Sequence, residues 1–142
     1  DQLTPIAIYS KLKERFPKEL SFLFESALSS EEGNYSFIFI GANERLTFKD
    51  NKTTHIDTDK KSNQLEVDPF SFLKSYYNKL DKDKYKKLSS ELNIGFIDGF
   101  IGFIGYDSVK IFEPILQDTM DALRDDLNAP DIDLIRPKLV VA

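Results

Sequence analysis

A glycine occurs at every third position of one apolar segment, Gly99-Phe100-Ile101-Gly102-Phe103-Ile104-Gly105. Glycines among phenylalanine and isoleucine are typical of a curved sheet in which another backbone packs closely. The segment lacks the Gly-Lys-Ser/Thr ending of a phosphate-binding loop, and its glycine spacing differs from the dinucleotide-binding fingerprint. It is also far shorter than the ~20 apolar residues that cross a bilayer. We therefore expect a soluble protein built around a sheet, with no membrane partner.

At two places in the sequence a threonine or an aspartate directly precedes a proline, and each pair predicts the beginning of a helix. The polar side chain can cap the helix, and proline suits its first position. Thr4-Pro5 predicts a helix that Pro17 ends, and Asp68-Pro69 predicts a second, amphipathic helix. Asp107 is expected to cap a further short helix. Strand-like segments are expected at 21–26, 35–40, 45–50, 53–57, 94–105, 132–135 and 138–141, with a turn at Asp50-Asn51 and a Lys-rich connection after the second helix. This pattern predicts an α+β fold with a mostly antiparallel sheet and a few packed helices.

The composition is that of a single globular domain. The 142 residues are 41% apolar and include no cysteine, which excludes disulfides, thiolate metal ligands and cysteine nucleophiles and is compatible with the cytoplasm, where we expect the protein. A net charge of −5 argues against nucleic acid as a partner, because phosphate neutralisation needs surplus Lys and Arg. The chain begins without Met and stops on the apolar run Leu139-Val140-Val141-Ala142, so we expect the natural protein to continue.

Two groups of residues suggest metal-binding or catalytic chemistry, and for both we favour a structural role. His55 is the single histidine. Without a second histidine or a cysteine it cannot complete a metal set, so we interpret it as an exposed strand residue. Asp131 and Asp133 can project from one strand face, but nothing nearby completes a calcium or magnesium loop. We expect solvated carboxylates at a sheet edge, and neither a metal nor a catalytic residue in this chain.

Glu25 is the best candidate for binding a ligand. It follows the apolar run Phe22-Leu23-Phe24, so its carboxylate is expected near a core edge, where an unpaired charge is costly. Such a carboxylate can receive an ammonium group, and the hydroxyl of the adjacent Ser26 can bind another polar group. The residues leave open a structural alternative, in which Glu25 bonds only to backbone groups or to a lysine.

Several segments occur together in a specific order. They are Thr4-Pro5, Ser21-Phe22-Leu23-Phe24-Glu25-Ser26, Gly33-Asn34-Tyr35-Ser36-Phe37-Ile38, Gly99-Phe100-Ile101-Gly102-Phe103-Ile104-Gly105-Tyr106-Asp107 and Pro130-Asp131. This ordered set resembles the amino-terminal domain of anthranilate synthase component I, the large subunit of that enzyme, over almost the whole chain. One departure is Asn34, where that family usually has a basic residue.

The resemblance implies that residues 1–142 form the amino-terminal regulatory domain of this large subunit. The complete subunit is a lyase of tryptophan biosynthesis that converts chorismate and ammonia to anthranilate and pyruvate. It uses magnesium, and a glutamine amidotransferase partner supplies the ammonia. Its chorismate and magnesium residues belong to a carboxy-terminal chorismate-binding domain that this chain lacks. We therefore expect the chain alone to be inactive and to hold no cofactor.

The resemblance also implies a feedback site for tryptophan. The residues that match its motif are Glu25, Ser26 and Ser36, and Leu23 and Tyr35 are further candidates. Free tryptophan needs an anion for its ammonium, donors for its carboxylate and an apolar slot for indole, which these side chains can offer in part. The same domain is expected to contact the amidotransferase subunit and its own chorismate-binding domain.

Two alternatives stay open. The large subunit of aminodeoxychorismate synthase, an enzyme of folate synthesis, has a similar amino-terminal domain, although the Thr4-Pro5 opening and the Gly-x-Tyr-Ser segment favour the tryptophan-pathway enzyme. A free-standing amino-acid-binding regulatory module is the other alternative, and the apolar end of the chain argues against it.

Overall fold

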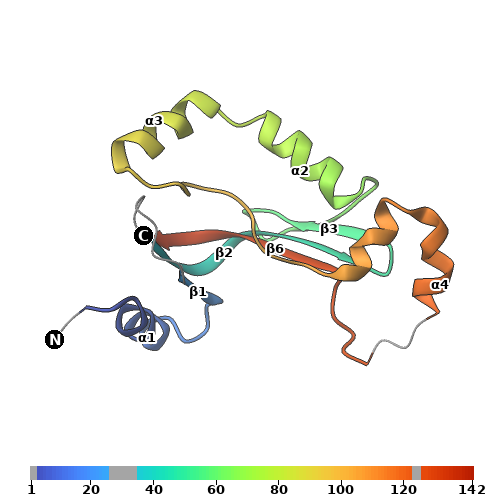
Figure 1. Ribbon diagram of the computed structural model, residues 1–142, viewed down its shortest axis with the longest axis horizontal. Helices are drawn as coiled ribbons and strands as arrows, with labels where there is room; N and C mark the ends of the chain where they lie inside the picture. Colours follow the sequence, from blue (N-terminus) through green and yellow to red (C-terminus); the bar gives the residue numbers. More distant parts are fainter. Residues whose placement is uncertain (1–2, 26–34, 123–125) are drawn as a thin grey trace. The chain divides into compact units, whose positions relative to one another are not determined.

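The computed structural model describes residues 3–25, 35–122 and 126–142. The elements in chain order are α1 (Pro5–Arg15), β1 (Ser21–Glu25), β2 (Ser36–Lys49), β3 (Lys52–Ile56), β4 (Ser62–Leu65), α2 (Pro69–Asn78), α3 (Lys82–Leu92), β5 (Ile101–Ile104), the 3-10 helices η1 (Tyr106–Ile111) and η2 (Pro114–Leu116), α4 (Gln117–Asp121) and β6 (Ile132–Val141). Figure 1 shows these elements along the chain. No helix in these described ranges is long and apolar enough to cross a membrane.

The described strands form one sheet of six, with the order β4-β3-β2-β6-β5 and with β1 beside the first part of β2. The pairs β1–β2, β2–β3, β3–β4 and β5–β6 are all antiparallel. This confirms the predicted α+β class with a mostly antiparallel sheet.

The chain divides into two compact units. Unit 1 comprises Asp1–Asn43, Asp83–Gly99 and Pro137–Ala142, and unit 2 comprises Glu44–Lys82 and Phe100–Arg136. Strands β2 and β6 and helix α3 contribute residues to both units. Each unit is described below by itself.

The core of unit 2 forms where α2 lies against the sheet. Buried side chains of β2 and β6 meet partly buried side chains of α2 and its surroundings: Leu46, Phe48, Ile132 and Leu134 pack against Leu65, Phe70, Phe72, Leu73, Phe100 and Ile111. Helix α2 begins as predicted, because the Asp68 carboxylate accepts the backbone N–H groups of Phe70 and Ser71 at 2.9 and 3.0 Å. The cap and the apolar face of α2 together fix this helix on the sheet.

Close approach of two backbones explains the glycine-rich segment of unit 2. A Cβ at Gly102, which has φ +151°, would lie 2.0 Å from the carbonyl oxygen of Asp133. A Cβ at Gly105 would lie 2.9 Å from the carbonyl oxygen of Asp131. The predicted role of these glycines in backbone packing is confirmed.

In unit 1, α1 and a row of aromatic side chains lie on opposite sides of the β1–β2 pair. We call this group the aromatic row; its members are Phe22, Phe24, Tyr35, Phe37 and Phe39. Helix α1 begins as predicted, with the Thr4 hydroxyl accepting the N–H of Ala7 at 3.2 Å. The hydroxyl of Tyr9 on this helix lies 3.1 Å from that of Ser21. On the other side, the Phe96 ring packs edge-on against Phe39 at a centroid distance of 5.3 Å.

Several predicted boundaries were wrong. The segments 35–40 and 45–50 belong to one strand, β2, because Gly41 adopts φ +68° and lets the strand continue through a local irregularity. The segments 132–135 and 138–141 likewise form one strand, β6, which passes through Pro137. The turn predicted at Asp50-Asn51 is confirmed, with φ of 50° and 57°, and joins β2 to β3.

The region after α2 also differs from the prediction. The expected Lys-rich connection contains helix α3, because Tyr85 and Leu88 give it one partly buried side. Within 94–105 only Ile101–Ile104 is a strand, since Phe96 packs on the aromatic row instead of joining a ladder. Asp107 lies inside η1 rather than at its cap, which is Gly105. Strand β4 was not predicted.

Candidate functional site

Glu25 and Ser36 are direct cross-strand partners at one end of the β1–β2 pair. The same register pairs Leu23 with Ile38. Partners in an antiparallel pair project to the same face, and so do residues two apart on a strand. Glu25, Leu23 and Ser36 therefore share one face, where Glu25 is exposed and the other two are half-buried. The predicted neighbour Ser26 lies outside the described residues.

Tyr35 belongs to the opposite side of this strand pair. Its ring stacks on Phe37 with a centroid distance of 6.2 Å, and Phe37 is the cross-strand partner of Phe24. The Tyr35 hydroxyl donates to the backbone oxygen of Asn93 at 2.6 Å. The structure thus brings Glu25, Ser36 and Leu23 together but places Tyr35 with the aromatic row.

The face that carries Glu25 is also the face on which α1 lies. Ser21 is two residues from Leu23 on β1, so its side chain projects to the same face, and the Tyr9 hydroxyl of α1 bonds there. Among the described lysines and arginines, none forms an ion pair with Glu25. The pair Glu25–Ser36 therefore presents a carboxylate and a hydroxyl beside an apolar strand surface.

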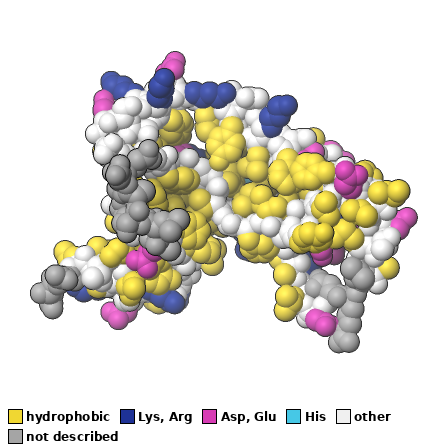
Figure 2. Space-filling view, viewed as in Figure 1, with side chains coloured by type: hydrophobic (Ala, Val, Ile, Leu, Met, Phe, Trp, Pro, Cys, Tyr) yellow, Lys and Arg dark blue, Asp and Glu magenta, His cyan; other side chains and the backbone are white. Residues whose placement is uncertain are grey.

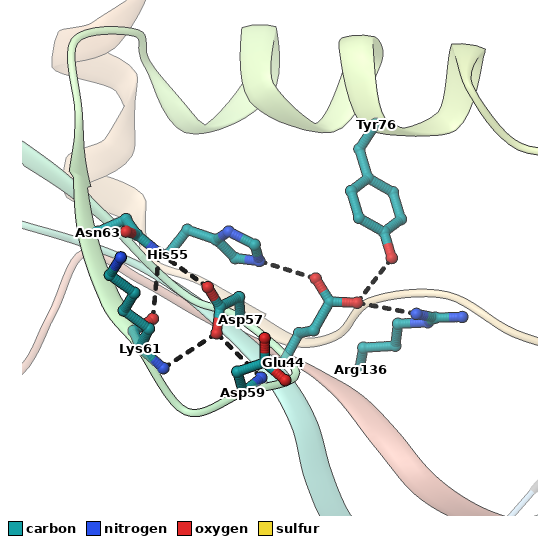
Figure 3. Close-up of polar contacts among 8 residues, drawn as sticks. All are labelled: Glu44, His55, Asp57, Asp59, Lys61, Asn63, Tyr76 and Arg136. Atoms are coloured by element: carbon teal, nitrogen blue, oxygen red, sulfur yellow. Dashed lines mark hydrogen bonds and ion pairs between the residues drawn. The ribbon is translucent and has the colours of Figure 1, made fainter.

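A second polar cluster, in unit 2, centres on Glu44, which is only 5% exposed. Figure 3 shows the three side chains that converge on its carboxylate. Oε1 accepts the Tyr76 hydroxyl and Arg136 Nη1, both at 2.8 Å. Oε2 lies 2.8 Å from His55 Nε2. These contacts join β2, β3, α2 and β6 through one carboxylate.

The donors around Glu44 keep this buried group ionised. Burial by itself raises the pKa of Glu44, but hydrogen bonds from Arg136, Tyr76 and His55 outweigh burial and hold the pKa below its usual value. Both oxygens of the Glu44 carboxylate are bound by protein groups. The arrangement is that of a structural ion pair that ties strands to a helix, not of a group poised to accept a substrate proton.

His55 corrects the sequence-based interpretation. It was expected to be an exposed strand residue, but its side chain is 13% exposed and its ring lies 4.7 Å from that of Phe72. The reason is that β3 lies next to β2 and under α2, so the histidine faces Glu44 and not solvent. In the described part of the chain, no group of three His, Asp or Glu residues is placed to hold a metal ion.

Asp131 and Asp133 are also not solvated carboxylates at a sheet edge. Arg45 binds Asp133 with two donors, Nε to Oδ1 at 2.8 Å and Nη2 to Oδ2 at 2.5 Å. Lys110 lies 3.0 Å from both Asp131 and Asp121. Asp133 is on β6, an inner strand between β2 and β5, and Asp131 directly precedes that strand, which explains why both carboxylates need cationic partners.

Sequence reasoning missed Glu44 altogether. A usable signal was present, because Glu44 is two residues before Leu46 and four before Phe48, both of which are core residues of the same strand. A carboxylate on the apolar face of a strand must find donors. That signal was obscured because the strand was expected to begin at residue 45.

The domain is therefore an α+β domain with an antiparallel sheet, a carboxylate–hydroxyl pair on one strand end and a buried carboxylate cluster. The chain is 31% identical over 141 residues to the chloroplastic anthranilate synthase alpha subunit 1 of Arabidopsis thaliana, covering 94% of this chain and 23% of the relative. It is 34% identical over 144 residues to anthranilate synthase component 1 of Aquifex aeolicus, covering 99% of this chain and 26% of the relative. The resemblance to the anthranilate synthase large subunit is confirmed.

A third relative, anthranilate synthase component 1 of Thermus thermophilus, is 29% identical over 142 residues, which cover 99% of this chain and 27% of the relative. The chain thus spans about a quarter of the length of the curated relatives it matches. No protein-family model matches the chain, and no solved structure matches it.

Proposed function

We propose that this chain is the amino-terminal regulatory domain of an anthranilate synthase large subunit. The whole subunit converts chorismate and ammonia to anthranilate and pyruvate with magnesium, and a glutamine amidotransferase partner supplies the ammonia. The catalytic groups belong to a chorismate-binding domain outside these 142 residues, so the chain alone does not turn over chorismate. The proposal is supported by relatives named as anthranilate synthase subunits that match 94% to 99% of the chain. We place the reaction in the cytoplasm.

The function of this domain is to bind tryptophan as a feedback inhibitor. The observation that carries this proposal is the cross-strand pairing of Glu25 with Ser36. Side chains in such a pair start about 4.5–5.5 Å apart at Cβ, so both can reach the ammonium and carboxylate of one amino acid. Leu23 on the same face offers apolar surface to the indole, and Ser26 adds a second hydroxyl. Tyr35 supports the strand from its other side.

The test is tryptophan inhibition of the full-length subunit with Glu25→Gln. Loss of a charge-assisted hydrogen bond of roughly 1.5–3 kcal/mol weakens inhibition about ten- to hundredfold. Ser36→Ala has a smaller effect, about two- to tenfold, because it removes a neutral bond of about 0.5–1.5 kcal/mol. Chorismate turnover without tryptophan stays at the wild-type rate in both variants, because neither side chain is catalytic.

Glu14→Gln is the matched control, because Glu14 is an exposed glutamate on α1 in the same unit. It leaves tryptophan inhibition unchanged. An inhibition constant in Glu25→Gln equal to that of the control would remove Glu25 from the site. Anthranilate fluorescence during turnover identifies the product, and formation of aminodeoxychorismate instead would assign the subunit to the folate pathway.

A further inference from the structure

Unit 2 exposes a group of large apolar side chains on three consecutive elements, β5, η1 and η2, and at the residue that follows η1. We call this group the apolar surface; its members are Ile104, Tyr106, Phe112, Ile115 and Leu116. Tyr106 is 87% exposed and Ile115 is 85% exposed. Figure 2 shows hydrophobic side chains gathered over the segments that Figure 1 colours orange, which include η1 and η2. Exposed apolar patches of this kind mark interaction sites in folded proteins.

The exposed charged side chains within residues 101–122, the segment that carries the apolar surface, are acidic. Asp107, Glu113 and Asp118 are exposed on or beside the same elements. The single cation of residues 101–122 is Lys110. Its side chain is only 9% exposed, and it is held between Asp121 and Asp131. The chemistry of the surface therefore fits a partner with an apolar centre and Lys or Arg at its rim.

Among the described strands β5 is at an edge of the sheet, and the apolar surface is continuous with that edge. Strand β5 is last in the order β4-β3-β2-β6-β5, so among the described strands only β6 pairs with it. An open strand edge offers backbone donors and acceptors to a further strand. Phe103 and Ile104 on β5 are both about half-exposed, at 48% and 53%.

We propose that the apolar surface and the β5 edge bind the remaining part of the large subunit itself. The basic rim of that part then faces Asp107, Glu113 and Asp118. This inference rests on the proposed function. The first argument for this partner is length, because the chain spans about a quarter of the length of its curated relatives. The second argument is composition, since aromatic and aliphatic side chains dominate permanent interfaces more than transient ones.

The first test replaces Ile115 by the photo-crosslinking residue p-benzoylphenylalanine in the full-length subunit, in the presence of its amidotransferase. The expected product is a crosslink within one subunit, from position 115 to a peptide beyond this chain, identified by mass spectrometry. A crosslink to the amidotransferase, a crosslink to a second copy of the subunit, or none at all would overturn the proposal. The matched control places the same group at Leu3, which is 71% exposed and belongs to unit 1, and gives no such intramolecular product.

The second test reverses the charges at the rim with Glu113→Lys and Asp118→Lys together. In the full-length subunit we expect loss of a single cooperative thermal transition, because the two parts of the subunit then unfold separately. The control pair, Glu14→Lys and Glu66→Lys, changes two exposed glutamates elsewhere and retains the single transition. Unchanged cooperativity in the Glu113/Asp118 variant would contradict the charged rim.

Anthranilate formation by the wild-type subunit is measured in parallel and tests the proposed function separately. An intramolecular crosslink from position 115 together with no anthranilate would keep the docking surface and refute the function. Anthranilate formation together with a crosslink only to the amidotransferase would keep the function and refute the docking surface.

Discussion

Tyr76→Phe tests how much the buried Glu44 cluster stabilises unit 2. The substitution removes one hydroxyl, which donates to Glu44 Oε1 at 2.8 Å. The ring contacts of Tyr76 with Phe72 and Phe100, at centroid distances of 5.8 and 5.2 Å, remain possible for phenylalanine. The change in the free energy of unfolding therefore reports the hydrogen bond and not the packing.

A hydrogen bond to a charged group contributes about 1.5–3 kcal/mol. Because Arg136 and His55 still bind the carboxylate after the change, we expect a loss of about 2 kcal/mol at pH 7, in the lower part of that range. With a urea m value of about 2 kcal/mol per M, the unfolding midpoint falls by about 1 M. Urea titration followed by circular dichroism measures it.

The loss also depends on pH in a defined direction. Hydrogen bonding holds the folded pKa of Glu44 below its usual value of 4.5, so the ionised group stabilises the fold above that value. This contribution is lost as pH falls through the folded pKa. The difference between wild type and Tyr76→Phe therefore shrinks in acid, as Glu44 becomes protonated in the folded state of both variants.

The matched control is Tyr77→Phe on the same helix. The Tyr77 hydroxyl accepts the backbone N–H of Phe100 at 3.0 Å, and the residue is 37% exposed. Loss of this neutral bond costs about 0.5–1 kcal/mol and does not depend on Glu44 ionisation. The reasoning is refuted if Tyr76→Phe is no more destabilising than Tyr77→Phe at pH 7, or if its effect grows as the pH is lowered.

Two further substitutions test the local devices of unit 2. Asp68→Ala removes the cap of α2 and lowers the free energy of unfolding by about 1 kcal/mol at pH 7. Hydrogen bonds from Ser71 and Phe70 outweigh burial and lower the pKa of Asp68, so this loss becomes smaller in acid. Urea titration at several pH values measures it. Gly102→Ala places a Cβ 2.0 Å from the backbone oxygen of Asp133, so we expect more than about 4 kcal/mol of destabilisation and loss of amide protection in β5. Gly95→Ala, with no atom within 4 Å of its added Cβ, is the control and stays within about 0.5 kcal/mol; equal effects at the two glycines would contradict the close-approach argument.

Local signals predicted the parts of the fold that local chemistry determines. Thr4 and Asp68 cap helices because their side chains bond to amides only two or three residues away. Asp50 and Asn51 form a turn because they tolerate positive φ, and such a turn matches the twist of a two-stranded hairpin. In each case the deciding contact lies within a few residues along the chain.

The elements that were predicted wrongly depend on distant partners. Helix α3 has a strongly polar sequence, and one contact that defines its inner side joins Tyr85 to Asp98, thirteen residues away. Strand β6 continues through Pro137 because neighbouring strands hold it, although proline lacks a ladder donor. Local propensity cannot report such support, since the supporting residues are far apart in the sequence.

The dependence on distant residues also explains why the sequence did not separate the roles of Glu25 and Glu44. Each is a carboxylate on the apolar side of a strand, two residues from a leucine, so the strand pattern alone does not separate them. Glu44 meets donors from three other elements, and the nearest of these, His55, is eleven residues away. Glu25 is exposed and faces a serine hydroxyl on the adjacent strand. The two residues therefore have opposite signatures: removing the Glu44 charge lowers stability, whereas removing the Glu25 charge leaves stability intact and weakens binding of an amino acid.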